Sequence, residues 1–425
     1  MPMGMTMIEK ILARHAGVES TKPGDILVCD VDMAVQIDLS YLVDEKLAQP
    51  KRIADPDKVA LILDHRVPAS KIDDAAAHAK ARAFAARFGI KRFFDVGRSG
   101  ICHQVIQESG LALPGQILVC SDSHTIASGV LNCGARGLGQ LEITQIVCTG
   151  KTWFKVAPTV LFRFEGTKPA NVFGKDILLH IAGRLGSFEG HNVEFSGPGL
   201  ATIPLDDRAT ICTMCAEISA EFATMPADAV VLDYLKGRTD VGFEPVESDA
   251  DASYAAVHVI DLSHIKPTVA KPDFIPKNTL PIAEFNDKVK IDQAFVGSCA
   301  NGKLEDLKAV AAILKGRRIA PGVRLVVTPA SQKVYLDALR AGYIETIAES
   351  GGLVTNSTCG ACAGGHMGVV GPGEVCLTSS TRNFRGRMGS PDARIYMASS
   401  ATVAASAVVG YITDPTAFLQ EAGIA

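Results

Sequence analysis

The feature that most constrains the fold of this chain is a repeated alternation of short β-branched runs with longer helical patterns. In the N-terminal part, strands are predicted at residues 25–29, 59–63, 92–96 and 116–120, and an Ala-rich helix is predicted at 71–88. In the C-terminal part, strands are predicted at 294–296, 323–327 and 374–377, and helices at 304–314 and 332–341. This repetition predicts an α/β protein with parallel sheets and helices on both faces. In such sheets, functional side chains gather in loops at the carboxyl ends of the strands.

The length of 425 residues exceeds what one ordinary hydrophobic core supports, so more than one domain is expected. The stretch 266–281 contains prolines at 267, 272, 276 and 281, which is typical of a linker. A weaker boundary is expected near residues 166–169. We therefore predict three α/β domains, at residues 1–165, at 166–285 with the linker included, and at 286–425.

The composition is typical of a soluble globular protein, with 47% hydrophobic residues, 21% charged residues and a formal net charge of -4. No block of Lys or Arg stands out, which argues against nucleic acid as the main partner. The 11 cysteines are dispersed, and residues 1–17 lack the apolar core of a signal peptide, so we expect a reducing, cytoplasmic location. The uncharged run 395–413 is long enough to cross a bilayer, but its many small residues favour a tightly packed internal helix. We therefore expect no membrane span.

Three cysteines supply a plausible ligand set for a metal cluster: Cys299 in Gly-Ser-Cys-Ala-Asn, and Cys359 and Cys362 in Ser-Thr-Cys-Gly-Ala-Cys. A four-iron cube held by three thiolates keeps one iron open to substrate, whereas electron-transfer clusters usually have four cysteine ligands. The glycine-rich run after Cys362 would let backbone N–H groups approach the cluster sulfurs. A zinc site built on Cys359 and Cys362 is a weaker alternative. Cys212 and Cys215 form a second C-x-x-C without a partner pair at zinc-finger spacing, and they are predicted to be buried apolar side chains.

Acidic and imidazole side chains cluster in the predicted loops. These residues are Asp64, His65, His103, Asp122 and His124. Two of the histidines have an aspartate within two residues, and an aspartate can orient an imidazole for proton transfer near neutral pH. The alternative for Asp122 and Ser123 is a turn in which both residues cap the backbone.

Two further motifs carry charges that suit an anionic substrate or a bound water. The run 379–387 contains Arg382, Arg385 and Arg387, and arginine is the side chain best suited to bidentate carboxylate binding. The alternative for this run is a solvated basic turn. Glu217 lies in a largely apolar stretch, where a carboxylate is either a satisfied structural group or one that handles water at a metal.

These motifs together resemble those of the aconitase superfamily, specifically the large subunit of the isopropylmalate dehydratase and homoaconitase branch. The resemblance extends from residues 7–12 (Met-Ile-Glu-Lys-Ile-Leu) to 401–406 (Ala-Thr-Val-Ala-Ala-Ser) and includes Gly-His-Met-Gly at 365–368. It implies three-layer α/β/α domains of the aconitase type without the mobile small-subunit domain. A separate small subunit would supply that domain. The resemblance also implies a [4Fe-4S] cluster whose ligands are Cys299, Cys359 and Cys362.

The resemblance further implies roles for individual residues. The residues that match catalytic positions are Asp64, His65, His103, Asp122, His124 and Glu217, and those that match substrate-binding positions are Ser123, Arg382 and Arg387. Three residues depart from the pattern: Ile37 replaces a polar His or Gln, and Thr213 and Thr381 each replace an Asn. Each departure removes a polar or amide group near the site, which leaves the choice of substrate open.

The sequence therefore predicts an iron–sulfur hydro-lyase that interconverts a hydroxy di- or tricarboxylic acid and its unsaturated acid. Isopropylmalate, homocitrate, citramalate and dimethylmalate-type acids are all candidate substrates. The alternative is a cluster-bearing sensor or RNA-binding regulator without dehydratase activity, against which the lack of a basic patch argues.

Overall fold

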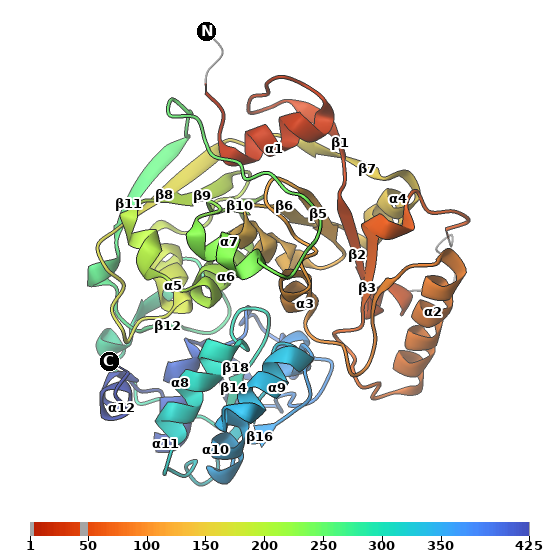
Figure 1. Ribbon diagram of the computed structural model, residues 1–425. Coiled ribbons are helices and arrows are strands. Elements are labelled where there is room, and N and C mark those ends of the chain that lie inside the picture. Colours follow the sequence, from red (N-terminus) through yellow and green to blue (C-terminus); the bar gives the residue numbers. More distant parts are fainter. Residues whose placement is uncertain (1–3, 43–49, 425) are drawn as a thin grey trace.

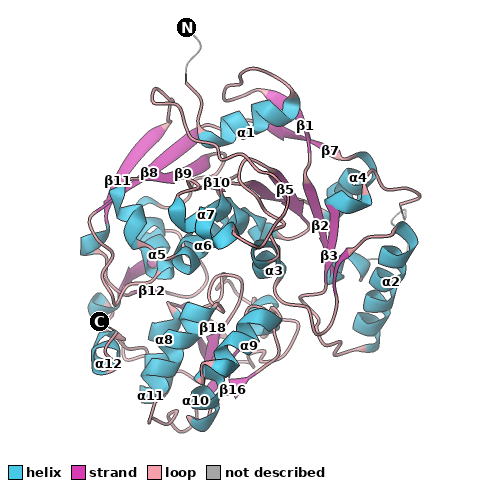
Figure 2. Ribbon diagram, in the orientation of Figure 1, coloured by secondary structure: helices cyan, strands magenta, loops and turns pink. Residues whose placement is uncertain are grey.

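The computed structural model describes residues 4–42 and 50–424. Within these residues, three largely parallel sheets follow one another along the chain and are flanked by helices (Figures 1 and 2). Residues 1–3, which belong to the segment tested above for a signal peptide, lie outside the described part. The predicted α/β class is confirmed, because the helices provide the crossover connections that parallel strands require.

The first sheet has the strand order β4–β3–β2–β5–β6, with all neighbours parallel. Its strands are β2 (Met33–Ile37), β3 (Val59–Ile62), β4 (Arg92–Phe94), β5 (Ile117–Cys120) and β6 (Gly134–Gly137). The accompanying helices are α1 (Met7–Ala16), α2 (Ile72–Phe88), α3 (Cys102–Glu108) and α4 (Gln140–Thr149). Every residue of β3 and β5 is buried, which is typical of strands covered on both faces.

Two strands of this region differ from the sequence prediction. The strand predicted at 25–29 is β1 (Ile26–Asp30), but it pairs antiparallel with β7 (Lys151–Lys155) in a separate two-stranded ribbon. The central strand β2 was not predicted from the sequence, because Gln36 interrupts its short apolar run. The amide oxygen of Gln36 accepts a 2.8 Å hydrogen bond from the Tyr41 hydroxyl, so this polar group is satisfied inside the protein.

The second sheet has the order β10–β9–β8–β11 and is also parallel. Its strands are β8 (Thr159–Glu165), β9 (Asn192–Ser196), β10 (Ala223–Thr224) and β11 (Ala256–Asp261), with the helices α5 (Gly174–Leu185), α6 (Leu205–Met214) and α7 (Ala229–Leu235). One hydrophobic core contains side chains from both this sheet and the first sheet. Cys212 and Cys215 are fully buried in that core, as expected from the sequence.

The third sheet has the order β13–β12–β18–β17–β14–β15–β16. Its strands are β12 (Thr268–Ala270), β13 (Thr279–Pro281), β14 (Gln293–Val296), β15 (Arg324–Val327), β16 (Leu353–Val354), β17 (Val375–Thr378) and β18 (Arg394–Met397). The helices are α8 (Leu304–Leu314), α9 (Gln332–Arg340), α10 (Tyr343–Glu349), α11 (Ser400–Val409) and α12 (Thr416–Glu421). This part of the chain, cyan to blue in Figure 1, lies below the first two sheets in that view.

Two predictions for this region are wrong in detail. The stretch 266–281 is not a free linker, because it carries β12 and β13, which form the antiparallel edge of the third sheet. Proline is tolerated there, since an edge strand does not need every backbone N–H for pairing. The run 395–413 is not one helix: it contains most of β18 and then α11, which is largely buried. No helix in the described ranges is long and apolar enough to cross a membrane.

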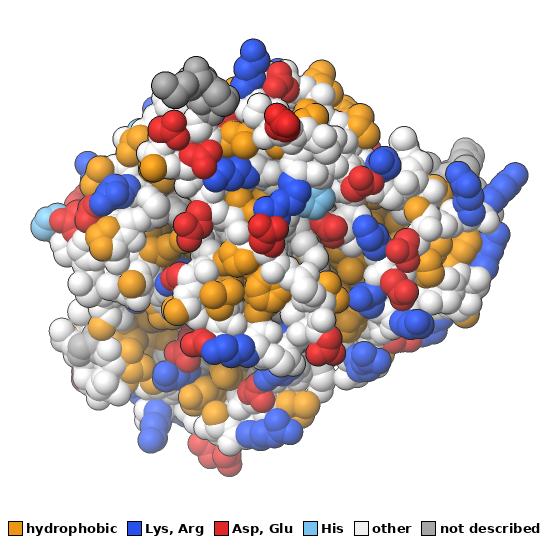
Figure 3. Space-filling view, turned by 45° about the horizontal axis from the view of Figure 1, so that its top comes forward, with side chains coloured by type: hydrophobic (Ala, Val, Ile, Leu, Met, Phe, Trp, Pro, Cys, Tyr) orange, Lys and Arg blue, Asp and Glu red, His pale blue; other side chains and the backbone are white. Residues whose placement is uncertain are grey.

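Acidic and basic side chains are interspersed over the face of the molecule drawn in Figure 3. No extended stripe of one sign is visible on that face. This surface therefore lacks the clustered Lys and Arg that mark a nucleic-acid interface.

Candidate active site

The candidate catalytic side chains meet where the three sheets approach one another. Most of them follow the carboxyl end of a strand, as the rule for parallel sheets predicts. Asp64 and His65 follow β3, and the run 122–124 follows β5. Cys299 follows β14, and Arg382 follows β17.

The first acid–imidazole pair is formed by neighbouring residues after β3. His65 Nδ1 donates a 2.6 Å hydrogen bond to Asp64 Oδ1, and both side chains are buried. Asp64 Oδ2 accepts the backbone N–H of Cys102 at the start of α3, at 3.1 Å, which fixes the carboxylate. Burial disfavours the charged imidazole, but the Asp64 carboxylate outweighs it and raises the pKa of His65. His65 is therefore held in a defined orientation, with Nε2 3.7 Å from Asp122 Oδ2.

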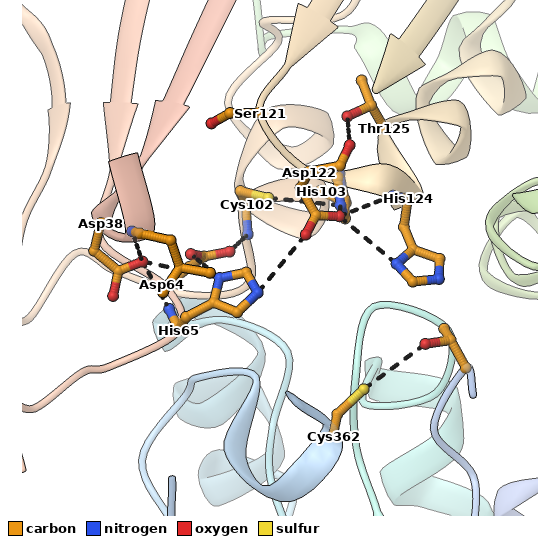
Figure 4. A network of polar contacts seen from close by, with 12 residues as sticks. Asp38, Asp64, His65, Cys102, His103, Ser121, Asp122, His124, Thr125 and Cys362 are labelled. Carbon is orange, nitrogen blue, oxygen red and sulfur yellow. Dashed lines mark hydrogen bonds and ion pairs between the residues drawn. The ribbon is translucent and has the colours of Figure 1, made fainter. Parts of the chain in front are cut away.

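Asp122 is the centre of a second group of imidazoles (Figure 4). Its Oδ1 accepts hydrogen bonds from His103 Nε2 at 2.6 Å and from the backbone N–H of His124 at 2.8 Å. Burial opposes ionisation of this carboxyl, but the charge and hydrogen bond of His103 hold the pKa of Asp122 well below its usual range. Of the predicted alternative, in which Asp122 and Ser123 both cap the backbone, the Asp122 cap is present, together with the histidine contacts. Asp122 both shapes the turn and orients the rings around it.

The third group joins the first two sheets to the third. Glu217, in the short 3₁₀ turn Cys215–Ile218, accepts hydrogen bonds at 2.8 Å from both His124 Nε2 and Arg382 Nε. Burial opposes the charged form of His124, but its hydrogen bonds to the carboxylates of Asp122 and Glu217 raise the pKa of His124. The contact with His124 in turn lowers the pKa of Glu217 despite its burial. The His124 ring is thus held between two carboxylates, with Nε2 2.8 Å from Glu217 Oε1 and Nδ1 3.6 Å from Asp122 Oδ1.

The three cysteines predicted as metal ligands come together from two separate loops. Cys299, Cys359 and Cys362 are 8%, 8% and 4% exposed. Cys299 and Cys359 share one small apolar cluster, and burial together with the nearby Cys362 and Cys359 thiols raises the pKa of Cys299. Gly360 allows the turn between the second and third cysteines, since its φ of +58° suits glycine. Three buried thiols from a tight turn and an opposing loop fit the donor set of a cluster held at three corners.

The arginines of the run 379–387 divide between the site and the surface. Arg387 Nη2 lies 3.9 Å from Cys362 Sγ, and its buried Nε has no hydrogen-bond partner within the described part of the chain. Arg385 is exposed and donates to the carbonyl oxygen of Pro391 at 3.2 Å. Arg387 is therefore the arginine with an N–H free to bind a ligand next to the cysteines.

Ser123, the remaining predicted substrate-binding residue, is exposed at the start of the 3₁₀ segment after β5.

Several contributing residues were missed by sequence reasoning. Asp38, directly after β2, accepts the backbone N–H groups of His65 at 3.1 Å and Arg66 at 2.7 Å. Thr358 Oγ1 donates to the carbonyl oxygen of Asp64 at 2.7 Å and ties the cysteine loop to the first sheet. If β2 had been recognised as a strand, Asp38 would have been predicted at its carboxyl end. The sequence therefore contained a signal for Asp38. Thr358 lies within the Ser-Thr-Cys-Gly-Ala-Cys motif, but nothing in that motif predicts its contact with Asp64.

The structure also shows where the three residues that depart from the family pattern lie. Ile37 is 1% exposed at the end of β2. Thr213 donates its hydroxyl to the carbonyl oxygen of Ala209 within α6 at 2.7 Å. Thr381 Oγ1 lies 3.7 Å from Cys362 Sγ. Thr381 therefore lies beside a predicted cluster ligand.

Comparison with known sequences gives a consistent result. A family model described as the aconitase family (aconitate hydratase) matches residues 9–410. A Mycolicibacterium smegmatis protein described as 3-isopropylmalate dehydratase large subunit is 58% identical over 412 residues, which cover 97% of each chain. The large subunit of 2,3-dimethylmalate dehydratase from Eubacterium barkeri is 40% identical over 419 residues, covering 97% of this chain and 99% of that one.

A solved structure supports the same fold. The holo-form of Thermococcus kodakaraensis aconitase X aligns with a TM-score of 0.51 and covers 86% of this chain and 88% of its own. Its sequence identity is 13%, so this likeness concerns the fold alone.

Proposed function

Because the chain belongs to the aconitase family, we propose that it is the large subunit of an iron–sulfur hydro-lyase that interconverts a hydroxy dicarboxylic acid and its unsaturated acid. The observation that carries this proposal is the meeting of three buried thiols with the linked Asp–His–Glu–Arg groups at one junction of the three sheets. A sensor without dehydratase activity would not require this ordered set of acid–imidazole pairs.

The cluster would be held by Cys299, Cys359 and Cys362, and when bound it would supply a Lewis-acidic iron that polarises the departing hydroxyl. Arg387, whose Nε is buried without a hydrogen-bond partner among the described residues, would bind a substrate carboxylate. Arg382 is already engaged by Glu217 through Nε, so only its remaining N–H groups would face the substrate.

The acid–imidazole groups would move and hold protons. His124, whose ring lies between Asp122 and Glu217, would donate a proton to the leaving hydroxyl from its charged form, which both carboxylates favour. His65 and His103 would be held in fixed orientations by Asp64 and Asp122, which keeps each ring in one tautomer. Ser123, exposed at the rim, would contact substrate from outside this buried group.

For the substrate, we propose a malate carrying an alkyl group, with 3-isopropylmalate first and 2,3-dimethylmalate as the second candidate. The names of the 58% and 40% identical relatives support these two acids.

We also propose that a separate small subunit completes the enzyme and supplies the group that removes the substrate proton, since the relatives are described as large subunits. A cytoplasmic location is proposed because all 11 cysteines, each within the described ranges, are free thiols.

The test is to purify the chain with and without a candidate small subunit, to reconstitute both samples anaerobically, and to assay dehydration of a panel of hydroxy acids. We expect turnover of an alkylmalate only by the complex, together with bound iron and acid-labile sulfide. Full turnover by the isolated chain would refute the need for a partner. Zinc without sulfide would refute the cluster, and a cluster-loaded complex inactive on every acid would refute the hydro-lyase.

A further inference from the structure

Two lysine side chains lie buried behind the loops that carry the cysteines. Lys175, in α5, is fully buried, and Lys303, directly before α8, is 2% exposed. Neither Nζ lies within 4.0 Å of a carboxylate oxygen of the described residues. Lysine is almost never fully buried without an opposite charge, because removing its ammonium group from water is costly. These two positions therefore need a physical explanation.

Lys175 fixes the loop that follows β17. Its Nζ donates to the carbonyl oxygens of Ser379 at 2.7 Å and Ser380 at 2.6 Å. The Ser379 hydroxyl accepts the backbone N–H of Gly297 at 3.2 Å and donates to the carbonyl oxygen of Asn301 at 3.3 Å. Gly297 and Asn301 flank Cys299, so Lys175 stabilises the arginine loop and the first cysteine loop together.

Lys303 folds back over the same cysteine. Its Nζ donates to the carbonyl oxygens of Cys299 at 3.0 Å and Ala300 at 2.6 Å, and to Thr210 Oγ1 at 3.2 Å. Thr210 also donates to the carbonyl oxygen of Ala300 at 2.5 Å. The Cys299 loop is thus held from the third sheet by Lys303 and from α6 by Thr210.

The nearest acidic group in this hydrogen-bonded network is already engaged elsewhere. Asp306 accepts hydrogen bonds from Asn301 Nδ2 at 2.8 Å, the backbone N–H of Lys303 at 3.2 Å, and Ser400 Oγ at 2.8 Å. Burial lowers the pKa of Lys175 to about 7, against the opposing influence of Asp306 and the nearby cysteine thiols.

Other carboxylates of this buried region have their own partners. Asp207 lies 3.6 Å from Lys168 Nζ and accepts the backbone N–H of Gly174 at 2.7 Å. Asp176 accepts the backbone N–H groups of Phe173 and Thr268 at 2.9 Å each. Asp206 accepts the Glu305 backbone N–H at the start of α8 at 3.5 Å, and its nearby positive charge is Lys303, beyond ion-pair distance. The two lysines therefore have no carboxylate of the described residues within 4.0 Å of Nζ, and Lys175 lies near the Cys299 and Cys362 thiols while Lys303 contacts the main chain of Cys299.

We propose that Lys175 and Lys303 are positioning residues for the iron–sulfur cluster, a proposal that rests on the function given above. A four-iron core with three thiolate ligands carries a net negative charge, which would favour the charged form of both lysines and which their ammonium groups would offset. Their hydrogen bonds to main-chain carbonyls keep the ligand loops in place while that charge is bound. The charge of the lysines should therefore raise the reduction potential of the cluster, because a nearby positive charge favours the addition of an electron.

The test uses the full chain with its small subunit, reconstituted anaerobically, and compares Lys175→Met, Lys303→Met and Lys175→Gln with the unmodified protein. Lys168→Met is the matched control, since Lys168 also donates to main-chain carbonyls but has Asp207 as its ion-pair partner. Two quantities are measured: the midpoint potential of the cluster by spectroscopically monitored titration, and the melting temperature before and after cluster loading.

We expect the equilibrium constant for one-electron reduction to fall about tenfold in each variant at Lys175 or Lys303, which corresponds to about 59 mV. The gain in melting temperature on cluster loading should shrink in the same variants, whereas Lys168→Met should lower both melting temperatures equally and leave the potential unchanged. Lys175→Gln keeps an N–H donor but no charge, so it should shift the potential as Lys175→Met does.

Unchanged potentials, with equal losses of melting temperature in both states, would show a purely structural role and overturn the proposal. If Lys175→Met does not fold, Lys303→Met and Lys175→Gln decide the question by the same two measurements. Failure of the unmodified protein to bind a cluster would refute the proposed function instead, so the two failures are distinguishable.

Discussion

Arg387 and Arg385 lie two residues apart and are expected to respond very differently to replacement by alanine. Arg387 points toward Cys362 and has a buried Nε without a hydrogen-bond partner among the described residues, whereas Arg385 is exposed and contacts Pro391. A hydrogen bond between an arginine and a carboxylate contributes about 1.5–3 kcal/mol. Loss of one such bond to the substrate therefore lowers kcat/KM roughly 10- to 150-fold in Arg387→Ala.

The assay is steady-state dehydration by the reconstituted complex, with iron and sulfide measured on each sample. Metal analysis is needed because the Arg387 charge, acting against burial, lowers the pKa of Cys362, so its loss also weakens the thiolate. Normalising the rate to bound iron separates substrate binding from cluster assembly. Arg387→Lys keeps the charge but not the bidentate fork, so its loss should be intermediate.

Arg385→Ala is the matched control and should leave kcat/KM unchanged. Equal losses at the two arginines would refute the assignment of Arg387 to the substrate. So would an unchanged kcat/KM in Arg387→Ala with normal iron content.

Three further outcomes are expected. Cys359→Ser should contain neither iron nor acid-labile sulfide after reconstitution. Cys212→Ser, which changes a side chain of the apolar core, should retain both. An intact cluster in Cys359→Ser would show that Cys359 is not a ligand. Asp122→Asn should lower kcat at least about tenfold, since it replaces a charged acceptor of two hydrogen bonds, and a rate equal to the unmodified enzyme would contradict its central role. The hydrogen bond to Asp32 outweighs burial and raises the pKa of His15 above 6.5, so the pair stabilises the fold below about pH 6.5 and loses this contribution as the pH rises through the folded pKa. The melting temperatures of the unmodified protein and His15→Gln should therefore converge toward alkaline pH, and a constant difference would exclude this linkage.

Much of the secondary structure was predictable because its signals are local. The helix predicted at 304–314 agrees with α8, and the strand predicted at 116–120 agrees with β5 within one residue. The stretch 266–281 was misjudged because proline suppresses a strand in isolation, whereas an edge strand of an existing sheet tolerates it. The predicted domain boundaries remain a prediction, although the first two sheets share one core.

The residues of the candidate site that lie in short sequence motifs were predictable. The C-x-x-C turn, Asp64-His65 and the Asp122–His124 run are each local, and the strand-end rule placed Asp64-His65 and the Asp122–His124 run after the carboxyl ends of two strands. Their roles in catalysis stay predictions. Asp38 was not predicted, because the strand before it, β2, was not recognised. The strand-end rule applies only where the strand is known.

The sequence by itself determined which groups are available: three thiols with cluster-like spacing, acid–imidazole pairs and an arginine-rich loop. Only the tertiary structure decided which of them meet. Glu217 joins His124 to Arg382 across 93 and 165 residues of sequence, and Arg387 rather than Arg385 faces the cysteines. The two buried lysines carry no sequence signal at all, because a lysine is expected at the surface until packing encloses it. Hydrophobic periodicity and turn chemistry act over a few residues, whereas contacts between sheets depend on packing over the whole chain.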